Sequence, residues 1–153
     1  MIKGRLREPD AVHGVILDGF PRTVPQAEAL DVLMAELGER ILIVPYFVIS
    51  EAEALARLSG RLVCTANDNH VYNLRDNPPK KSGVCDIDGA PLKIRDDDQP
   101  DAIKARIGAY KADTGPVLDY YRARGVLREI NAEQPIDQVA AELKTAVEAA
   151  KQP

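Results

Sequence analysis

The sequence predicts an α/β fold, because short apolar runs typical of buried strands alternate with segments of helical periodicity. The runs lie at residues 15–17, 45–49 and 126–130, the last interrupted by Arg128 and Glu129, and helical patterns lie between them and after the last of them. Continuous apolar runs of this length are typical of parallel strands that are covered on both faces. We therefore expect a parallel sheet flanked by helices.

Capping residues and glycines indicate where the expected helices begin and end. Residues 23–26 and 50–53 have the spacing of a capping box, Thr to Gln in the first case and Ser to Glu in the second. Gly38 and Gly60 are placed to end the two helices that follow. Further helical patterns occupy residues 103–124 and 136–147.

The composition excludes several classes of function. Of the 153 residues, 45% are hydrophobic, which is ample for a core, and a formal net charge of −4 gives no general attraction for nucleic acid or an anionic membrane. No apolar run approaches the length needed to span a bilayer, and no secretory signal opens the sequence. Two cysteines cannot form a disulfide framework, so a cytoplasmic location is expected. The length suggests one domain with an inserted lobe.

The segment GVILDGFPRT, residues 14–23, is the most informative part of the sequence. Asp18 follows the first apolar run, and a carboxylate at the end of a parallel strand is well placed to hold hydrated Mg²⁺ beside phosphates. Gly19 lets the backbone approach a ligand closely, and Arg22 has the planar guanidinium that grips a phosphate. The alternative is a strand that ends in a tight turn with Arg22 in solvent. The complete string favours one half of a phosphoryl-transfer site.

The string LDGFPRT, followed by Gln26, resembles the signature of the adenylate kinases and their nucleoside monophosphate kinase relatives. The resemblance covers nearly the whole chain in the family's order, through Gly60-Arg61, residues 77–80, Cys85 to Gly89, Arg95 to Asp98, Arg106 and Tyr120-Tyr121. It implies a doubly wound parallel sheet of the P-loop NTPase type, here incomplete, with a small β lid insertion. The implied organisation is an N-terminal part of the core at residues 1–61, a lid at 62–95 and a C-terminal part of the core at 96–153.

The resemblance also implies reversible, Mg²⁺-dependent phosphoryl transfer, ATP + AMP to 2 ADP, with these nucleotides as ligands and a monomer at full length. It implies that AMP is bound by Gly19, Arg22, Gln26, Arg95 and Arg106. It assigns ATP to Arg57, Arg61, Val71, Tyr72 and Gln134, the last in the loop at residues 131–135 that packs on adenine in the family. It gives catalytic roles to Asp18, Arg57, Arg61, Arg95 and Arg106. Several arginines are needed because negative charge spreads over the oxygens of a loose transition state, and the protein supplies mainly positioning and counter-charge.

Some of these residues also have an ordinary structural alternative. Gln26 can cap its helix as well as contact the adenine of AMP, and we expect both. Arg57 and Arg61 are four residues apart and are expected to share a helix face, where they repel each other unless an anion lies between them; the alternative is a solvated face. Asp97 and Asp98 match the hinge acids of the family, and their structural alternative is to stabilise the start of the next helix.

Residues 62–95 are polar, rich in Asn, Asp and Gly, and contain no clear helical pattern. They resemble the lid of long-form adenylate kinases, a small β insertion that closes over ATP and excludes water. Val71-Tyr72 matches a strand of that lid. Because short forms and other monophosphate kinases lack the lobe, its presence favours an adenylate kinase over a UMP/CMP-type kinase.

Two cysteines of the lid segment suggest a metal site. Cys64 and Cys85 stand where some relatives bind structural Zn²⁺, and Asp88 is a further candidate ligand. A structural zinc site needs four ligands. Asn67 is a poor fourth ligand and His70 is a nearby substitute. The alternative is a lid held by hydrogen bonds between polar residues, which other relatives use.

The phosphate-binding loop of the family, G-x-x-x-x-G-K-[ST], does not occur in the sequence. Seventeen residues precede Asp18, and we expect residues 2–8 to form a helix that relatives enter much later in their chains. The sequence thus resembles an adenylate kinase without its front third, and we expect the chain alone to be poorly stable and inactive. The alternatives are a non-catalytic nucleotide- or zinc-binding module, another nucleoside monophosphate kinase, and an active kinase that takes its phosphate loop from a second polypeptide.

Overall fold

The computed structural model describes residues 2–151, which form a mixed α/β structure of two compact units. The first unit contains residues 2–47, 111–130 and 136–151, and the second contains residues 48–110 and 131–135. One sheet has two strands and the other has three. The prediction of an α/β fold with a parallel sheet and a small β insertion is confirmed.

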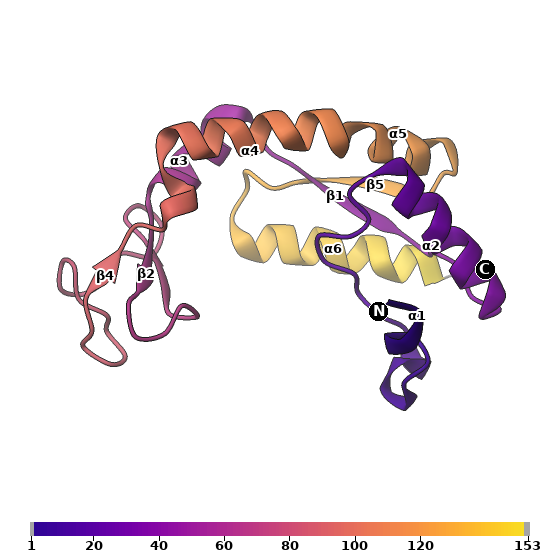
Figure 1. Ribbon diagram of the computed structural model, residues 1–153, viewed down its shortest axis with the longest axis horizontal. Coiled ribbons are helices and arrows are strands. Elements are labelled where there is room, and N and C mark those ends of the chain that lie inside the picture. Colours follow the sequence, from indigo (N-terminus) through magenta and orange to yellow (C-terminus); the bar gives the residue numbers. More distant parts are fainter. Residues whose placement is uncertain (1, 152–153) are drawn as a thin grey trace. The chain divides into compact units, whose positions relative to one another are not determined.

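The two-stranded sheet consists of β1 (Val44–Val48) and β5 (Leu127–Asn131), which Figure 1 shows side by side. The Val44 N–H donates to the Val126 carbonyl and the Ala132 N–H donates to the Val48 carbonyl, each over 2.9 Å. Because the partners advance in the same direction along both strands, the strands are parallel. They occupy two of the three predicted apolar runs.

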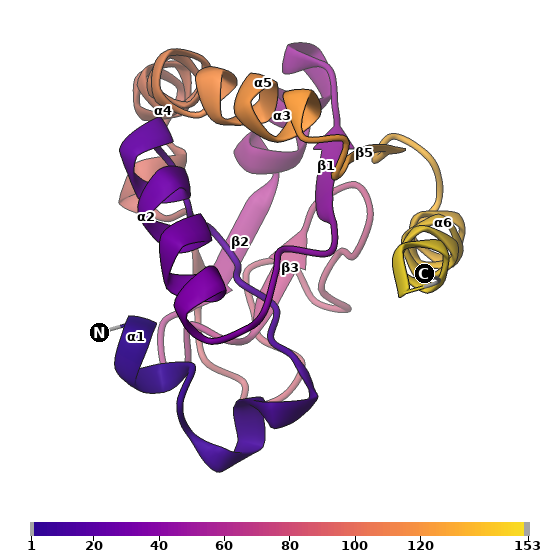
Figure 2. The same cartoon turned by 90° about the vertical axis from the view of Figure 1, so that its right-hand side faces the viewer.

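The core of the first unit lies where α2 (Val24–Glu36) packs against α5 (Gly115–Ala123), as Figure 2 shows. Its buried side chains are Ala27, Val117, Tyr121 and Leu127. Because Leu127 belongs to β5, this cluster joins the two helices to the parallel sheet. The C-terminal helix α6 (Ile136–Lys151) contributes no buried side chain.

Helix α2 begins and ends where the sequence predicts. The expected capping box does not form, because the Thr23 side chain makes no cap bond and the Oε1 atom of Gln26 accepts the N–H of Arg22, one residue before the N-cap, at 2.8 Å. At the other end, Gly38 has a φ of 72°, and the Glu39 N–H donates to the Met34 carbonyl at 2.9 Å. This is a Schellman motif, which favours glycine at the left-handed position.

The prediction of a buried parallel strand at residues 15–17 is wrong. Residues 14–17 have no regular secondary structure, and the side chain of Ile16 is 96% exposed. A strand needs a neighbour to pair its backbone N–H and carbonyl groups, and none of the described strands is paired with this segment. The preceding residues form α1 (Ile2–Arg5) and the 3₁₀ helix η1 (Pro9–His13), so the helix expected over residues 2–8 is shorter than predicted.

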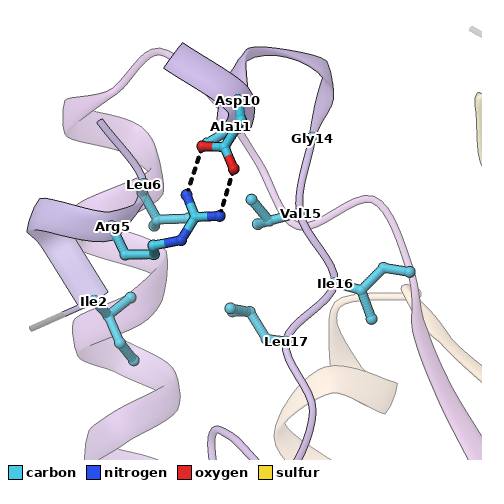
Figure 3. A pocket seen from close by; sticks show the side chains of 9 residues that line it. All are labelled: Ile2, Arg5, Leu6, Asp10, Ala11, Gly14, Val15, Ile16 and Leu17. Carbon is cyan, nitrogen blue, oxygen red and sulfur yellow. Dashed lines mark hydrogen bonds and ion pairs between the residues drawn. The ribbon is translucent and has the colours of Figure 1, made fainter. Parts of the chain in front are cut away.

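The unpaired segment lines a cavity of about 250 Å³ in the first unit. Figure 3 shows Val15 and Leu17 pointing toward the cavity and Ile16 pointing away from it. Arg5 and Asp10 form a bidentate ion pair at the same cavity, with distances of 2.8 and 2.7 Å. The side chains therefore alternate as in an extended strand although the backbone has no partner.

The second unit contains an antiparallel sheet in the order β3–β2–β4. The strands are β2 (Arg61–Cys64), β3 (Val71–Asn73) and β4 (Leu92–Lys93). Leu62 of β2 pairs with Tyr72 of β3, and Cys64 of β2 pairs with Leu92 of β4. The sheet forms the small β insertion that the sequence predicts, while the lid boundaries at residues 62–95 stay a prediction.

Helix α3 (Glu51–Ser59) precedes this sheet, and Ser50 caps it by accepting the Glu53 N–H at 3.3 Å. The helix ends before Gly60, so Arg61 is the first residue of β2. The prediction that Arg57 and Arg61 share a helix face is therefore wrong, because strand pairing takes over directly after the glycine. The 3₁₀ helix η2 (Asp96–Asp98) and helix α4 (Pro100–Asp113) complete the described elements. None of the described helices combines the length and apolar character needed to cross a bilayer.

Two adjacent tyrosines of α5 allow a test of the core. Tyr121 is 1% exposed and its hydroxyl has no hydrogen-bond partner among the described residues, whereas Tyr120 donates to Asp31 at 2.8 Å. A buried hydroxyl without a partner costs on the order of 1–3 kcal/mol. Tyr121→Phe should leave the free energy of unfolding unchanged or raise it by about 1 kcal/mol, and Tyr120→Phe should lower it by about 1 kcal/mol. Urea unfolding measures both, and a larger loss for Tyr121→Phe than for Tyr120→Phe would contradict this account.

Candidate functional site

A depression of about 290 Å³ in the second unit brings together most of the residues predicted to bind ATP. Its lining comes from the end of α3, the start of β2 and the segment that contains β3, and consists of Arg57, Leu58, Arg61, Val71, Tyr72, Asn73 and Asn77. Four of these residues, Arg57, Arg61, Val71 and Tyr72, are among the five predicted at ATP. The fifth, Gln134, lies half-buried in residues 131–135 of the same unit.

Val71 and Tyr72 are neighbours on β3 with opposite exposure, since successive side chains of a strand point to opposite faces. Val71 is 46% exposed, and Tyr72 is only 6% exposed. The Tyr72 hydroxyl accepts the Asp86 N–H at 2.7 Å and lies 3.5 Å from the Cys85 sulfur. Tyr72 therefore anchors the inside of the β insertion, while Val71 presents an apolar surface.

Arg57 is held from two sides. Its Nε donates to Glu53 Oε1 at 2.7 Å, and its Nη2 donates to the Ala132 carbonyl at 2.8 Å. The next residue, Glu133, accepts the Ser50 N–H at 2.7 Å. These contacts tie α3 to residues 131–135, the loop that the sequence predicts to lie against adenine.

Arg61 and Asp98 form a bidentate ion pair that is largely withdrawn from solvent. The Nε and Nη2 atoms of Arg61 donate to the two carboxylate oxygens at 2.7 and 2.5 Å, and Asp98 is 2% exposed. The hydrogen bond to Asp98 raises the pKa of the Arg61 guanidinium above its ordinary value. The run of three aspartates in the sequence carries no sign that only the last one is buried.

Arg95 and Arg106 also lie close to acids of this turn, Asp97 and Asp98. Arg95 Nε donates to Asp97 at 3.0 Å, and Arg106 Nη1 lies 3.4 Å from Asp97 and 3.5 Å from Asp98. Three of the four arginines predicted to be catalytic, Arg61, Arg95 and Arg106, thus gather around two carboxylates. A phosphorylated ligand would compete with these carboxylates for the same N–H donors.

The residues predicted at the AMP phosphate form a turn at the start of α2. Gly19 has a φ of 67°, and Arg22 Nε donates to its carbonyl at 2.7 Å. The positive φ favours glycine at this position, and a Cβ atom there would lie 3.0 Å from the end of the Arg22 side chain, which would have to shift. Gln26 accepts the Arg22 N–H just before the helix, and its contact with adenine stays a prediction. Asp18 is exposed. These residues belong to the first unit, and the other predicted site residues belong to the second.

Four potential metal ligands converge in the β insertion: Cys64, His70, Cys85 and Asp88, whose ligand atoms all lie within 4.8 Å of one another. His70 Nδ1 lies 3.0 Å from Asp88 and 3.4 Å from Cys85 Sγ, and Cys64 Sγ lies 3.3 Å from Asp88. Tetrahedral zinc with bonds of about 2.0–2.3 Å places its ligand atoms roughly 3.3–3.8 Å apart. The donor set and its spacing therefore fit Zn²⁺.

The fourth position of this set belongs to His70. The Asn67 amide nitrogen lies 3.2 Å from His70 Nε2, on the far side of the ring from Asp88. The Asn67 side chain therefore contacts the histidine ring, on the side away from Asp88.

Hydrogen bonds favour the charged forms of two of these ligands. Burial by itself raises the pKa of the Cys85 thiol, but hydrogen bonds with the Tyr72 hydroxyl and two backbone N–H groups lower it overall. The Ala90 N–H, with help from Cys85, lowers the pKa of Asp88 to about 2. Burial raises the pKa of the Cys64 thiol. Because metal ligands must be deprotonated, Cys85 and Asp88 suit a metal and Cys64 would lose its proton on binding.

Comparison with known proteins agrees with these features. The family profile described as adenylate kinase matches residues 1–126. An adenylate kinase of Streptomyces avermitilis is 42% identical over 139 residues, which cover 91% of this chain and 63% of that protein. An adenylate kinase of Streptomyces coelicolor is 42% identical over 151 residues, 99% of this chain and 68% of that protein. One of Methanosarcina barkeri is 43% identical over 144 residues, 94% of this chain and 66% of that protein. The chain belongs to the adenylate kinase family.

Family membership confirms the identification made from LDGFPRT and the motifs that follow it. The chain spans about two thirds of the length of these adenylate kinases, 63% and 68% for the two Streptomyces proteins. The roles of individual residues stay predictions. Residues outside the predicted site contact residues inside it; among them are Glu53 at Arg57, Asp98 at Arg61 and His70 at Cys85. Nothing in the sequence singles out Glu53, whose expected role was to cap α3.

The buried ion pair makes a prediction about stability. Asp98→Asn keeps the shape of the side chain but leaves Arg61 without its counter-charge, and removing one partner of a buried pair costs about 3 kcal/mol. Asp96→Asn is the matched control, because Asp96 is exposed in the same turn. Urea unfolding should show a loss of about 3 kcal/mol for Asp98→Asn and less than about 0.5 kcal/mol for Asp96→Asn. Equal effects would contradict a special role for Asp98.

Proposed function

We propose that this chain supplies the ATP-binding residues, the lid and part of the AMP site of an adenylate kinase, which converts ATP and AMP to two ADP. The observation that carries the proposal is the depression lined by Arg57, Arg61, Val71 and Tyr72. Nucleotides combine phosphates with a flat base, and guanidinium groups beside apolar surface suit both parts.

The arginines around Asp97 and Asp98 would act on the transferring phosphoryl group. Without an anion, Arg61, Arg95 and Arg106 are paired with these acids. We propose that phosphate oxygens take over some of their N–H donors, so that positive charge lies where the transition state develops negative charge. One such arginine contributes on the order of 10³-fold or more to the rate.

On the AMP side, Arg22 would bind the phosphate. Gly19 lets the ligand approach the backbone, and the amide nitrogen of Gln26 would contact adenine while its oxygen accepts the Arg22 N–H. Mg²⁺ supplies neutralising charge on the phosphate oxygens when it is bound with ATP. Asp18 fits a hydrated ion of this kind, since Mg²⁺ takes one or two protein carboxylates and keeps several waters.

Catalysis by these 153 residues alone is not expected, because they contain no G-x-x-x-x-G-K-[ST] string. That loop holds the phosphates through its backbone N–H groups and its lysine. We propose that the loop comes from outside these residues, and that the lid occupies residues 62–95 between core parts at residues 1–61 and 96–153. We also propose a cytoplasmic location, which the two free cysteines support, and a monomer at full length.

A coupled assay of ADP formation from ATP and AMP tests the proposed reaction. The chain alone should be inactive, and a fusion that adds the phosphate-loop segment of a bacterial relative before Met1 should be active. In the fusion, Arg22→Ala should lower kcat/KM for AMP by roughly 10²–10³-fold. Arg40→Ala, which removes another exposed arginine of the same unit, should leave it unchanged. Activity of the chain alone would refute the need for the loop, and an inactive, folded fusion would refute the reaction.

We further propose that the lid binds one structural Zn²⁺ through Cys64, His70, Cys85 and Asp88. Competition with a chromophoric chelator should give one zinc ion per chain. Replacing His70 by alanine should weaken binding by at least roughly tenfold, since a ligand matters more than the contacts behind it. His13→Ala is the control, because His13 lies in the first unit. Absence of zinc binding, or equal losses in the two variants, would favour a lid held by hydrogen bonds alone.

A further inference from the structure

The side chain of Glu53 lies between two arginines. Arg57 Nε donates to its Oε1 atom at 2.7 Å. Arg75 binds from a different segment, with Nη1 donating to Oε2 at 2.9 Å and Nη2 donating to Oε1 at 2.5 Å. The Glu53 side chain is 22% exposed. One carboxylate therefore fixes the positions of two guanidinium groups.

Glu53 can make these contacts because Glu133 takes over its expected capping role. In a capping box, the side chain at the third helical position accepts the N–H of the cap residue. Here the Ser50 N–H donates to Glu133 Oε1 at 2.7 Å, while Ser50 still accepts the Glu53 N–H at 3.3 Å. The cap of α3 is complete without the carboxylate of Glu53, which turns toward the arginines.

The contact with Glu53 determines how Arg57 is presented at the depression. Arg57 is anchored at Nε by Glu53 and at Nη2 by the Ala132 carbonyl. A planar group bound at two of its nitrogens has a defined orientation, whereas an arginine without such anchors samples many rotamers. Loss of Glu53 would leave Arg57 with one anchor.

The second arginine connects this arrangement to the turn after β3. The Asn73 side chain accepts the Arg75 N–H at 2.9 Å and donates to the Arg57 carbonyl at 2.9 Å. Arg75 Nε also pairs with Asp76 at 2.7 Å. The turn is thus tied to α3 by Asn73 through the backbone and by Glu53 through side chains.

The charge on Glu53 persists at any pH at which the protein would be assayed. Hydrogen bonds from Arg75 first, and then from Arg57, lower the pKa of Glu53 to about 2. The carboxylate is therefore ionised at neutral pH, and the contact with Arg57 is charge-assisted.

We propose that Glu53 is a positioning residue for nucleotide binding, which orients Arg57 at the depression and couples that orientation to Arg75 in the turn after β3. The proposal rests on the proposed function, in which Arg57 contacts the phosphates of a nucleoside triphosphate. Glu53 acts through Arg57 and does not itself meet the ligand. No other carboxylate among the described residues contacts both Arg57 and Arg75.

Exchange of the Arg57 Nε–H with water, followed by NMR on the full 153-residue chain, tests the positioning without any nucleotide. Glu53→Gln should accelerate this exchange by roughly tenfold or more, because the charge-assisted bond is lost. Glu51→Gln makes the same charge change in the same helical turn and should alter it less than about twofold. Arg75→Gln keeps the carboxylate and should give an intermediate acceleration, which also tests the coupling if Glu53→Gln does not fold. Unchanged exchange in the folded Glu53→Gln or Arg75→Gln chain overturns the proposal.

Binding of MgATP by calorimetry tests the consequence. Glu53→Gln should weaken binding by roughly five- to tenfold, and should add nothing in an Arg57→Ala background, because the two residues act as one unit. Additive losses would overturn the proposal, since a general effect on the fold would not depend on Arg57. If the unsubstituted chain binds no MgATP, the proposed ATP site of this chain fails, and the exchange measurement alone decides the role of Glu53.

Discussion

The buried carboxylate of Asp98 is the constraint on which the second unit depends. A carboxylate withdrawn from water is costly unless a cation and hydrogen-bond donors compensate it. Arg61 supplies both through two bonds of 2.7 and 2.5 Å. Since Arg61 begins β2 and Asp98 ends the turn before α4, this ion pair joins the antiparallel sheet to a helix. Any ligand that draws Arg61 away must leave Asp98 compensated, and Arg106, 3.5 Å from it, is the available substitute.

The other arginines of the candidate site are likewise paired with carboxylates. Arg57 is paired with Glu53 and Arg95 with Asp97, so the site holds its cations in place before any anion arrives. Such pairing lowers the gain from binding a phosphate, because an existing bond must be exchanged for a new one. In return the guanidinium groups keep fixed positions, and fixed positions are what electrostatic stabilisation of a transition state requires. Fixed guanidinium groups of this kind are what the proposed phosphoryl transfer would need.

In the first unit, by contrast, an apolar segment has no described strand paired with it. Residues 15–17 have the composition of an inner strand, and their side chains alternate as in one, but their backbone is unpaired among the described residues. Parallel pairing joins segments that are distant in sequence, so composition can indicate a strand without showing whether a neighbour is present. Asp18 and Gly19 follow this segment directly.

The sequence by itself determined the family, the α/β class and the ends of α2 and α3, because these depend on local patterns: an ordered set of motifs, glycines after helices and capping residues before them. It also predicted a set of site arginines, three of which the structure places around Asp97 and Asp98. Only the tertiary structure decided the partner of each arginine, the loss of the strand at residues 15–17 and the choice of His70 over Asn67. Several such contacts join segments far apart in the chain: Asp98 lies 37 residues from Arg61, and Glu133 lies 83 residues from the Ser50 N–H that it accepts. Local sequence carries no record of such contacts, because they depend on how strands and loops pack after the chain has folded.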